Sequence, residues 1–156
     1  MTPSQRLKEL NITLPPAPTP VASYIAGTRV GNLVLVSGQL PMSEGKLLAA
    51  GKVGGDVPLE QARLAARQCG LNALAVAAQV AGGIDRLARI VRLAVFVNSA
   101  PGFTDQPKVA NGASDLMVEI FGDAGKHARA AVGCNELPLN AAVEVELQAE
   151  VRGNTA

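Results

Sequence analysis

An arginine followed along the chain by a row of acidic residues carries the clearest chemical signal in this sequence. Arg129 lies in the stretch His-Ala-Arg-Ala-Ala-Val, among small apolar residues. After Leu137-Pro138, residues 142–151 alternate between apolar and polar side chains. In a strand this alternation places Glu144, Glu146, Gln148 and Glu150 on one face and the apolar residues on the other. One of these acids could therefore meet the arginine.

The surroundings of Arg129 mean that its guanidinium needs an anion. A buried charge without a partner costs several kcal/mol. A cross-strand glutamate would make a structural ion pair with Arg129. A substrate carboxylate would instead make a bidentate contact that a lysine could not reproduce. The spacing of the residues leaves both partners open.

Other kinds of catalytic site lack the residues that they need. His127 is the one histidine of the chain, and a catalytic zinc or iron site needs about three clustered ligands. We therefore predict no metal. The glycines of residues 51–55 lack the spacing of a nucleotide-binding loop. A Ser-His-Asp triad would have to combine His127 with Ser37 or Ser99, and neither serine lies in a nucleophile-elbow pattern.

Composition predicts one ordinary globular domain. The chain has 156 residues, of which 48% are hydrophobic and 17% charged, and its net charge is +1. Without a basic stripe, binding to nucleic acid is disfavoured. Cys69 and Cys134 are predicted to be reduced, and each to be a small buried hydrophobe. No apolar run approaches the ~18 residues of a membrane span, so we predict a cytoplasmic protein without membrane contact.

The first half of the chain divides into an arm and a hairpin. Residues 1–20 contain a short amphipathic piece, 5–10, and a proline-rich piece, 14–20, and are expected to form an extended N-terminal arm. A single domain is expected over 21–153. Residues 24–30 and 33–38 are predicted strands joined at Gly31-Asn32, a pair typical of hairpins. Residues 41–55 are glycine-rich and predict a loop with room for one short strand.

Two helices are predicted to cover one face of the sheet. The longer begins at Asp56 or Pro58 and ends at Gly82-Gly83, with small apolar residues at steps of three and four. Gly70 within it marks either a tight contact or simple tolerance of glycine. Residues 89–97 predict a central strand and 106–121 a second helix. This order favours an α+β fold in which a sheet carries two helices on one face.

Several of these motifs, taken in order, resemble the Rid family of reactive intermediate deaminases, also called YjgF-type or L-PSP-type proteins. The resemblance rests on Tyr24, on Gly31-Asn32-Leu-Val-Leu-Val-Ser37-Gly38-Gln-Leu-Pro41, on the Val-Phe-Val that ends 91–97, on Ala-Arg129-Ala-Ala-Val and on Leu137-Pro138 with Val-Glu144-Val-Glu146. It covers roughly residues 21–152. These motifs keep nearly the spacing of the family.

The resemblance implies a chorismate-mutase-like fold and a homotrimer with its sites in clefts between subunits. The best-known branch hydrolyses reactive enamines and imines to 2-keto acids and ammonia without a cofactor. Arg129 matches the arginine that holds the substrate carboxylate, and Glu144 the acid that positions the attacking water. Tyr24, Ser37 and Gly38 match the lining of the same pocket.

This chain departs from the best-known branch at several points. Ala131 stands in place of a cysteine, and the arm and the loop after Pro41 are longer, so the resemblance is to a longer branch whose substrate stays open. His127 either assists proton transfer or caps local structure.

The second hypothesis for function is a non-catalytic trimer that senses a small carboxylate. A third, an L-PSP-type endoribonuclease, is disfavoured because the chain lacks a histidine pair and a basic groove.

Overall fold

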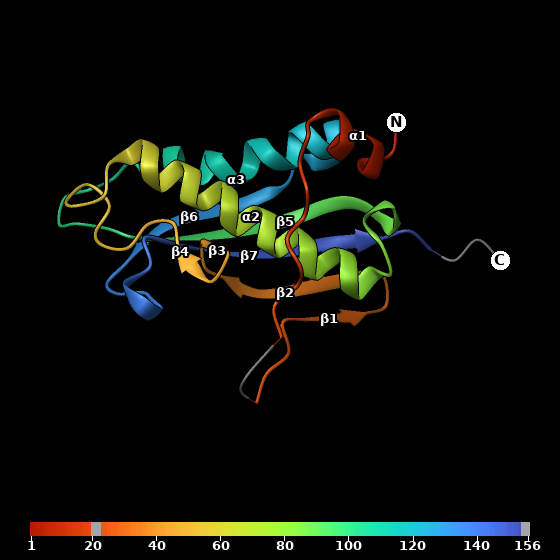
Figure 1. Ribbon diagram of the computed structural model, residues 1–156, viewed down its shortest axis with the longest axis horizontal. Coiled ribbons are helices and arrows are strands. Elements are labelled where there is room, and N and C mark those ends of the chain that lie inside the picture. The colour runs from red at the N-terminus through yellow and green to blue at the C-terminus, as the bar shows by residue number, and fades with distance from the viewer. Residues whose placement is uncertain (20–22, 154–156) are drawn as a thin grey trace.

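A five-stranded sheet organises the chain (Figure 1), and the computed structural model describes residues 1–19 and 23–153. The strand order is β1-β2-β7-β5-β6. The strands are β1 (Gly27–Val30), β2 (Leu33–Gln39), β7 (Val143–Val151), β5 (Leu87–Asn98) and β6 (Ala128–Cys134). Neighbours are antiparallel except β5 and β6, which run parallel. The predicted α+β class is confirmed.

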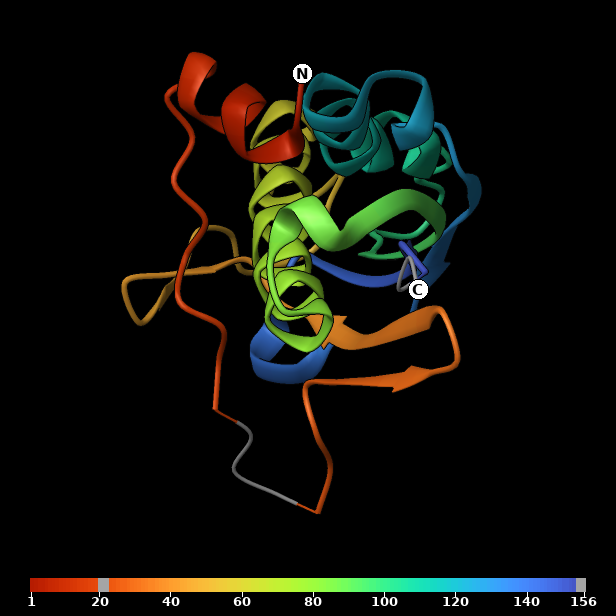
Figure 2. The ribbon, with the colours of Figure 1, turned by 90° about the vertical axis from the view of Figure 1, so that its right-hand side faces the viewer.

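Helices α2 (Leu59–Ala81) and α3 (Gln106–Phe121) lie close to their predicted bounds. Pro58 is the N-cap of α2, and Gly82 ends it in the left-handed conformation, with φ 84°, which glycine adopts without steric cost. Figure 2 shows the helices gathered on one side of the sheet. The opposite face of the sheet carries no helix among the described residues.

Two glycines let α2 and α3 approach closely. A Cβ atom at Gly70 would lie 3.2 Å from Cδ2 of Leu116, and a Cβ atom at Gly112 would overlap the backbone carbonyl of Arg63. The tight-contact interpretation of Gly70 is therefore confirmed. The helices bury the apolar face of β7, whose alternating residues are at most 1% exposed: Val143, Val145, Leu147, Ala149 and Val151.

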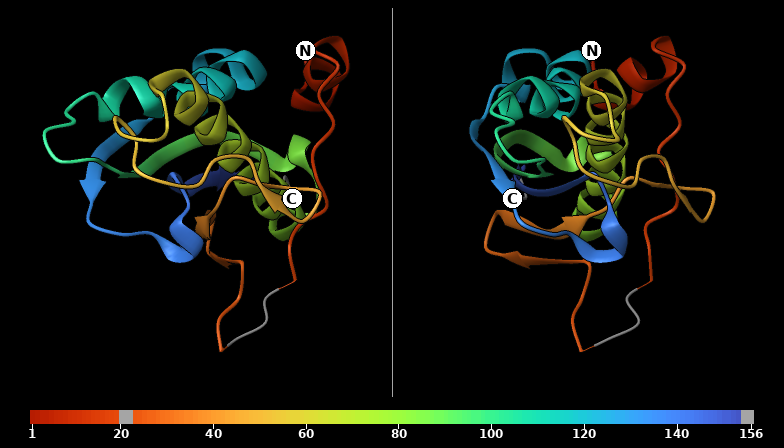
Figure 3. Two further views of the ribbon diagram at one scale, coloured as in Figure 1. Left: turned by 60° about the vertical axis from the view of Figure 1, so that its left-hand side comes forward. Right: turned by 90° about the vertical axis from the view of Figure 1, so that its left-hand side faces the viewer.

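The N-terminal arm is only partly extended. Helix α1 (Pro3–Glu9) begins at Thr2 with a capping box. Ser4 donates from its backbone N–H and its hydroxyl to the Asp85 carboxylate, at 2.8 and 2.6 Å. The expectation of an extended arm is thus wrong for residues 3–9, because Leu7 is buried in the core. Residues 12–19 then run without regular structure beside α2 (Figure 3). The predicted boundary at 20/21 lies outside the described residues.

The hairpin and the loop after it differ in detail from the prediction. Gly31, with φ 59°, turns the chain between Val30 and Leu33, as predicted. Strand β1 starts only at Gly27, so Tyr24 lies before the strand. Residues 41–55 contain two short strands, β3 (Met42–Ser43) and β4 (Lys46–Leu47). Residues 1–19 and 23–153 also contain three short 3-10 helices: η1 (Ile84–Arg86), η2 (Gly122–Gly125) and η3 (Pro138–Asn140).

No helix within residues 1–19 and 23–153 has the length and apolar character needed to cross a bilayer.

Candidate functional site

Arg129 projects from the edge strand β6 towards the helix-covered side of the sheet. Its register partner on the parallel strand β5 is Leu93, which is fully buried beneath the helices. The Arg129 guanidinium reaches α3, where Nη1 donates to Oδ1 of Asn111 at 2.8 Å and to Oγ of Ser114 at 3.1 Å. Both acceptors are neutral. No carboxylate forms an ion pair with Arg129 in the described part of the chain.

The glutamates of β7 face away from Arg129. Glu144 is in register with Phe96 of β5, whereas Arg129 is in register with a core position of that strand. Strand β5 also separates β6 from β7. The expectation that one of these acids meets Arg129 is therefore wrong within one protomer. The alternation of side chains along each strand was predicted correctly. The pairing of β5 with both neighbours, however, places Arg129 and Glu144 on opposite faces of the sheet.

The Glu144 carboxylate lies against Gly38 of β2. A Cβ atom built on Gly38 would overlap Oε1 of Glu144 and lie 2.8 Å from its Cδ. Between Val36 and Gln39 the register with β7 shifts by one residue, and such a bulge brings Ser37 and Gly38 to the open face of the sheet. Burial, and secondarily the charge of Glu146, raises the pKa of Glu144. The structure thus brings Gly38 and Glu144 together.

Ser37 and Tyr24 lie at the same end of the hairpin. The Ser37 hydroxyl donates to the backbone carbonyl of Ile25 at 2.8 Å, which ties residues 23–26 to β2. The Tyr24 side chain is 57% exposed. Both residues line a hollow of ≈ 400 Å³ on the open face of the sheet, together with Arg92 and Glu146. Tyr24, Ser37 and Gly38, three of the predicted pocket residues, therefore gather near Glu144 and apart from Arg129.

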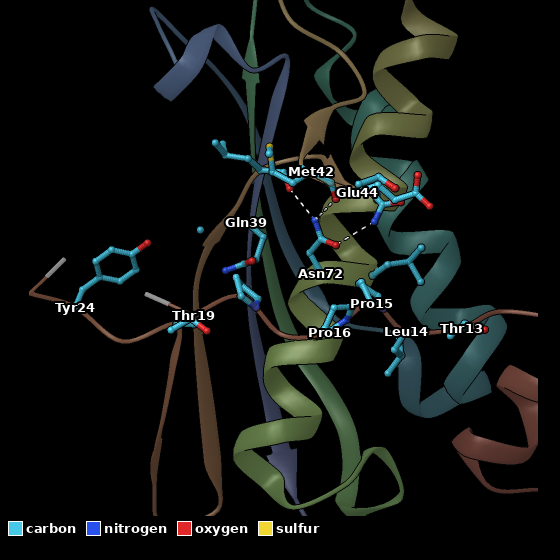
Figure 4. Close-up of a pocket in the computed structure, with 18 residues that line it drawn as sticks. Thr13, Leu14, Pro15, Pro16, Thr19, Tyr24, Gln39, Met42, Glu44 and Asn72 are labelled. Atoms are coloured by element: carbon cyan, nitrogen blue, oxygen red, sulfur yellow. Dashed lines mark hydrogen bonds between the residues drawn. The ribbon is translucent and has the colours of Figure 1, made fainter. Parts of the chain in front are cut away.

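A larger hollow, of ≈ 680 Å³, lies between the N-terminal arm, the β2–β3 connection and α2 (Figure 4). Tyr24 and Gly38 also line this arm hollow, whose apolar wall includes Leu14, Pro15, Pro16, Met42 and Leu71. Asn72 is buried at its base, where Nδ2 donates to the carbonyls of Leu40 and Met42 at 2.9 and 3.0 Å. Asn72 thereby fixes the path of the chain beyond β2, a role that the sequence analysis missed.

His127 lies directly before β6 and makes two hydrogen bonds. Nδ1 is 2.6 Å from the carbonyl oxygen of Gly125, and Nε2 is 3.0 Å from Oγ of Ser114. Burial, and to a lesser degree the charge of Arg129, lowers the pKa of His127. Its serine partner is Ser114, whereas Ser37 and Ser99 bond to backbone carbonyls elsewhere, in line with the absence of a triad pattern in the sequence. His127 and Arg129 share a contact with the same helix residue.

Asn111 and Ser114 are hydrogen-bond partners of Arg129 that the sequence did not reveal. They are three residues apart on α3, so they lie one above the other on one helix face. A polar pair at this spacing beside the buried stripe of Val109, Ala113 and Leu116 was the available signal. This polar pair indicates a contact with Arg129 only once β6 is known to lie beside α3.

Metal and thiol chemistry find little support. Within the described ranges, no group of three or more His, Cys, Asp or Glu side chains could hold a metal ion. Cys69 and Cys134 are free thiols, and burial raises the pKa of both. Neutral thiols are poor nucleophiles. Cys69 is fully buried, as predicted, whereas the prediction is wrong for Cys134, which is only partly buried.

Residues 4–151 match the protein family described as "YjgF/chorismate mutase-like, putative endoribonuclease". The structure is similar to that of protein Atu1372 from Agrobacterium tumefaciens, with a TM-score of 0.87 and 46% identity over 96% of this chain and 92% of the other. A protein from Shewanella oneidensis, described as a "putative endoribonuclease", matches with a TM-score of 0.92 and 36% identity over 97% of this chain and 100% of the other.

A relative with a stated activity is also similar. The 2-iminobutanoate/2-iminopropanoate deaminase of Dermatophagoides farinae is 33% identical over 135 residues, which are 86% of this chain and 91% of that protein.

Proposed function

This chain belongs to the YjgF/chorismate-mutase-like family, and on that premise we propose that it hydrolyses reactive 2-imino or 2-enamino acids to 2-keto acids and ammonia. The observation that carries the proposal is the environment of Arg129. Its guanidinium is held by two neutral oxygens, and no carboxylate of the described chain neutralises it. Its charge and part of its hydrogen-bonding capacity therefore stay available for the carboxylate of a small acid.

We further propose that each site is shared between two subunits of a homotrimer. Arg129 lies on the helix-covered side of an edge strand, whereas Glu144 and Gly38 lie on the open face. One substrate can touch both only if a second copy supplies one of them. An edge strand and an uncovered sheet face are surfaces on which a second copy can pack.

Hydrolysis of an imine needs only a water molecule oriented beside the C=N bond and one general base. A protonated C=N bond is already electrophilic, so a water held beside its carbon can attack it. As the new C–O bond forms, Glu144 accepts a proton from the water and returns it to the nitrogen. The new hydroxyl group then gives its proton to Glu144 as the C–N bond breaks, ammonia leaves, and a 2-keto acid remains. Glu144 releases this proton to the solvent. A raised pKa brings Glu144 closer to neutral pH, where a general base is most effective.

The remaining predicted residues line the proposed site. Tyr24, Ser37 and Gly38 would border the substrate, and the reaction balances without a cofactor. We propose a cytoplasmic setting, in which the two free thiols, Cys69 and Cys134, would stay reduced.

Generation of imines in situ tests this function. An amino-acid oxidase or dehydratase supplies 2-imino acids from a panel of amino acids, and the rate of 2-keto acid formation is followed with and without the protein. We expect faster release with the parent protein and no acceleration with Arg129→Ala. An Arg129→Ala variant as active as the parent would overturn the proposal.

The alternative is a non-catalytic trimer that binds a small carboxylate. The neutral hydrogen-bond partners of Arg129 favour this function as well, because they leave its charge available. Glu144→Gln separates the two functions. A hydrolase loses turnover in this variant and largely keeps its affinity for 2-keto acids, whereas a sensor has no turnover to lose.

Endoribonuclease activity is the weaker alternative, because the chain has one histidine and a net charge of +1.

A further inference from the structure

Four residues form a continuous hydrogen-bonded chain that ends at the Arg129 guanidinium. The carbonyl of Gly125 lies 2.6 Å from Nδ1 of His127, and Nε2 of His127 lies 3.0 Å from Oγ of Ser114. Oγ of Ser114 in turn accepts from Nη1 of Arg129 at 3.1 Å. Gly125 ends η2, His127 lies directly before β6, Arg129 lies in β6, and Ser114 lies in the middle of α3.

The donor and the acceptor of each of these hydrogen bonds follow from the chemistry of the groups. A backbone carbonyl can only accept, so Nδ1 of His127 must carry a proton. Burial lowers the pKa of His127, which favours the neutral ring, and in the neutral ring Nε2 is an acceptor. Ser114 must then donate its hydroxyl proton to Nε2. The lone pairs of Ser114 are thereby turned towards Arg129.

Both acceptors on α3 bind the same nitrogen of Arg129. Nη1 carries two protons, and it donates one to Asn111 at 2.8 Å and one to Ser114. No hydrogen bond from Nε or Nη2 occurs in the part of the chain that the structure describes. These two nitrogens form one edge of the guanidinium, and their parallel N–H groups match the spacing of the two oxygens of a carboxylate.

We propose that Asn111, Ser114 and His127 are positioning residues that anchor Nη1 of Arg129, so that its Nε–Nη2 edge takes up a carboxylate side-on. His127 acts through Ser114 and does not touch the substrate. The inference rests on the proposed function for the identity of the substrate. It adds the residues that orient Arg129 and the edge of the guanidinium that meets the carboxylate, and it assigns His127 a role other than proton transfer.

The test compares acids with their uncharged amides. Pyruvate, 2-oxobutanoate and phenylpyruvate are unreactive probes with a carboxylate, and the corresponding 2-oxoamides lack the second acceptor oxygen and the charge. Binding is measured by calorimetry for the parent, Ser114→Ala, Asn111→Ala and Ser114→Thr. Asp115→Ala is the matched control, because Asp115 is the next residue of α3 and contacts Arg63.

We expect Ser114→Ala and Asn111→Ala each to weaken binding of the acids about tenfold, which is the scale of a hydrogen bond to a charged group. Amide binding should change less than twofold. Ser114→Thr keeps the hydroxyl and should keep the affinity for acids, and Asp115→Ala should resemble the parent. In imine hydrolysis, Ser114→Ala should raise KM about tenfold and leave kcat within about twofold.

A double variant tests the path through Ser114. If His127 acts only through Ser114, Ser114→Ala combined with His127→Ala binds acids no more weakly than Ser114→Ala alone. A further loss in the double variant would show that His127 meets the ligand and would overturn its assigned role.

Other results would overturn the proposed binding of a carboxylate by the anchored Arg129 guanidinium, called the Arg129 clamp below. These are equal losses for acids and amides in Ser114→Ala, unchanged acid affinity in that variant, or no binding of any acid by the parent. A loss of kcat at constant KM would instead make Ser114 a nucleophile beside His127. The expected binding pattern without imine turnover in any variant would refute the hydrolase and leave the Arg129 clamp standing.

Discussion

Arg129 and Glu144 lie on opposite faces of the same sheet, with strand β5 between their two strands. Arg129 is in register with buried Leu93, and Glu144 with Phe96 on the other face. Within one protomer the two side chains therefore point away from each other. A site that uses both residues must therefore be assembled from two copies of the chain, and this requirement links the proposed chemistry to the proposed trimer.

The contact between Gly38 and Glu144 gives a prediction for stability. In Gly38→Ala the new methyl group would overlap the Glu144 carboxylate. The overlapping atoms belong to the end of the Glu144 side chain, which can turn aside, so we expect a loss of about 0.5 to 1.5 kcal/mol in the free energy of unfolding, the cost of a displaced rotamer. We also expect a loss of hydrolysis because the carboxylate moves. Denaturant unfolding measures the first effect. Gly38→Ala combined with Glu144→Ala should recover most of the lost stability.

Gly55→Ala is the matched control for this variant. A Cβ atom at Gly55 meets its neighbours at 3.4 Å or more, and the residue does not have a positive φ. Its unfolding free energy should stay within about 0.5 kcal/mol of the parent's. Equal losses in the two alanine variants, or no recovery in the double variant, would contradict the packing of Glu144 on Gly38.

The pH dependence of hydrolysis should reveal the raised pKa of Glu144. A general base works when it is deprotonated, so kcat/KM should fall as the pH drops through a value above that of an ordinary glutamate. The profile of kcat/KM against pH measures this value. An acid limb at or below about 4.3, the pKa of an unperturbed glutamate, would contradict the burial of the carboxylate.

The same residue affects stability with a definite sign. Because the pKa of Glu144 is raised in the folded state, its contribution to stability is complete below the unfolded-state pKa and is lost as the pH rises through the folded-state pKa. Glu144→Gln removes this loss. The variant should therefore be at least as stable as the parent at pH 7, although it is inactive.

His127 should affect stability in the opposite direction. Burial lowers its folded-state pKa below the unfolded value of about 6.5, so its stabilising contribution is present above that value and is lost as the pH falls through the folded-state pKa. The neighbouring charge is the guanidinium of Arg129. Between pH 7.5 and 5, the parent should lose more unfolding free energy than His127→Gln. Parallel curves for the two proteins would contradict this environment.

Local patterns in the sequence predict most of the elements correctly. Gly82-Gly83 and Glu60 mark the ends of α2, Gly31-Asn32 marks the hairpin, and the alternation of residues 143–151 marks a half-buried strand. Each of these signals acts over a few neighbouring residues. Helix α1 was underestimated because its stability comes from distant partners, such as Asp85 for Ser4.

The site is harder to predict because it depends on which strands pair. The sequence identifies Arg129 and Glu144 as chemical groups, but the parallel pairing of β6 with β5 decides the face on which Arg129 lies. Asn111 becomes an acceptor for the guanidinium only through this pairing. A bulge after Val36 similarly brings Gly38 beneath Glu144. No local periodicity encodes such long-range relationships.

The shared site is tested most directly by mixing two inactive subunits. Arg129→Ala and Glu144→Gln chains with different affinity tags are co-expressed, and assemblies that carry both tags are isolated in two steps. In a trimer whose sites each take Arg129 from one subunit and Glu144 from the next, every mixed assembly contains one intact site out of three. Light scattering checks that these assemblies are trimers.

We predict that the doubly tagged assemblies hydrolyse 2-imino acids at about one third of the parent rate, whereas each variant alone is inactive. Doubly tagged trimers that are no more active than their inactive parents would contradict the account, because Arg129 and Glu144 would then not act on one substrate across a subunit boundary.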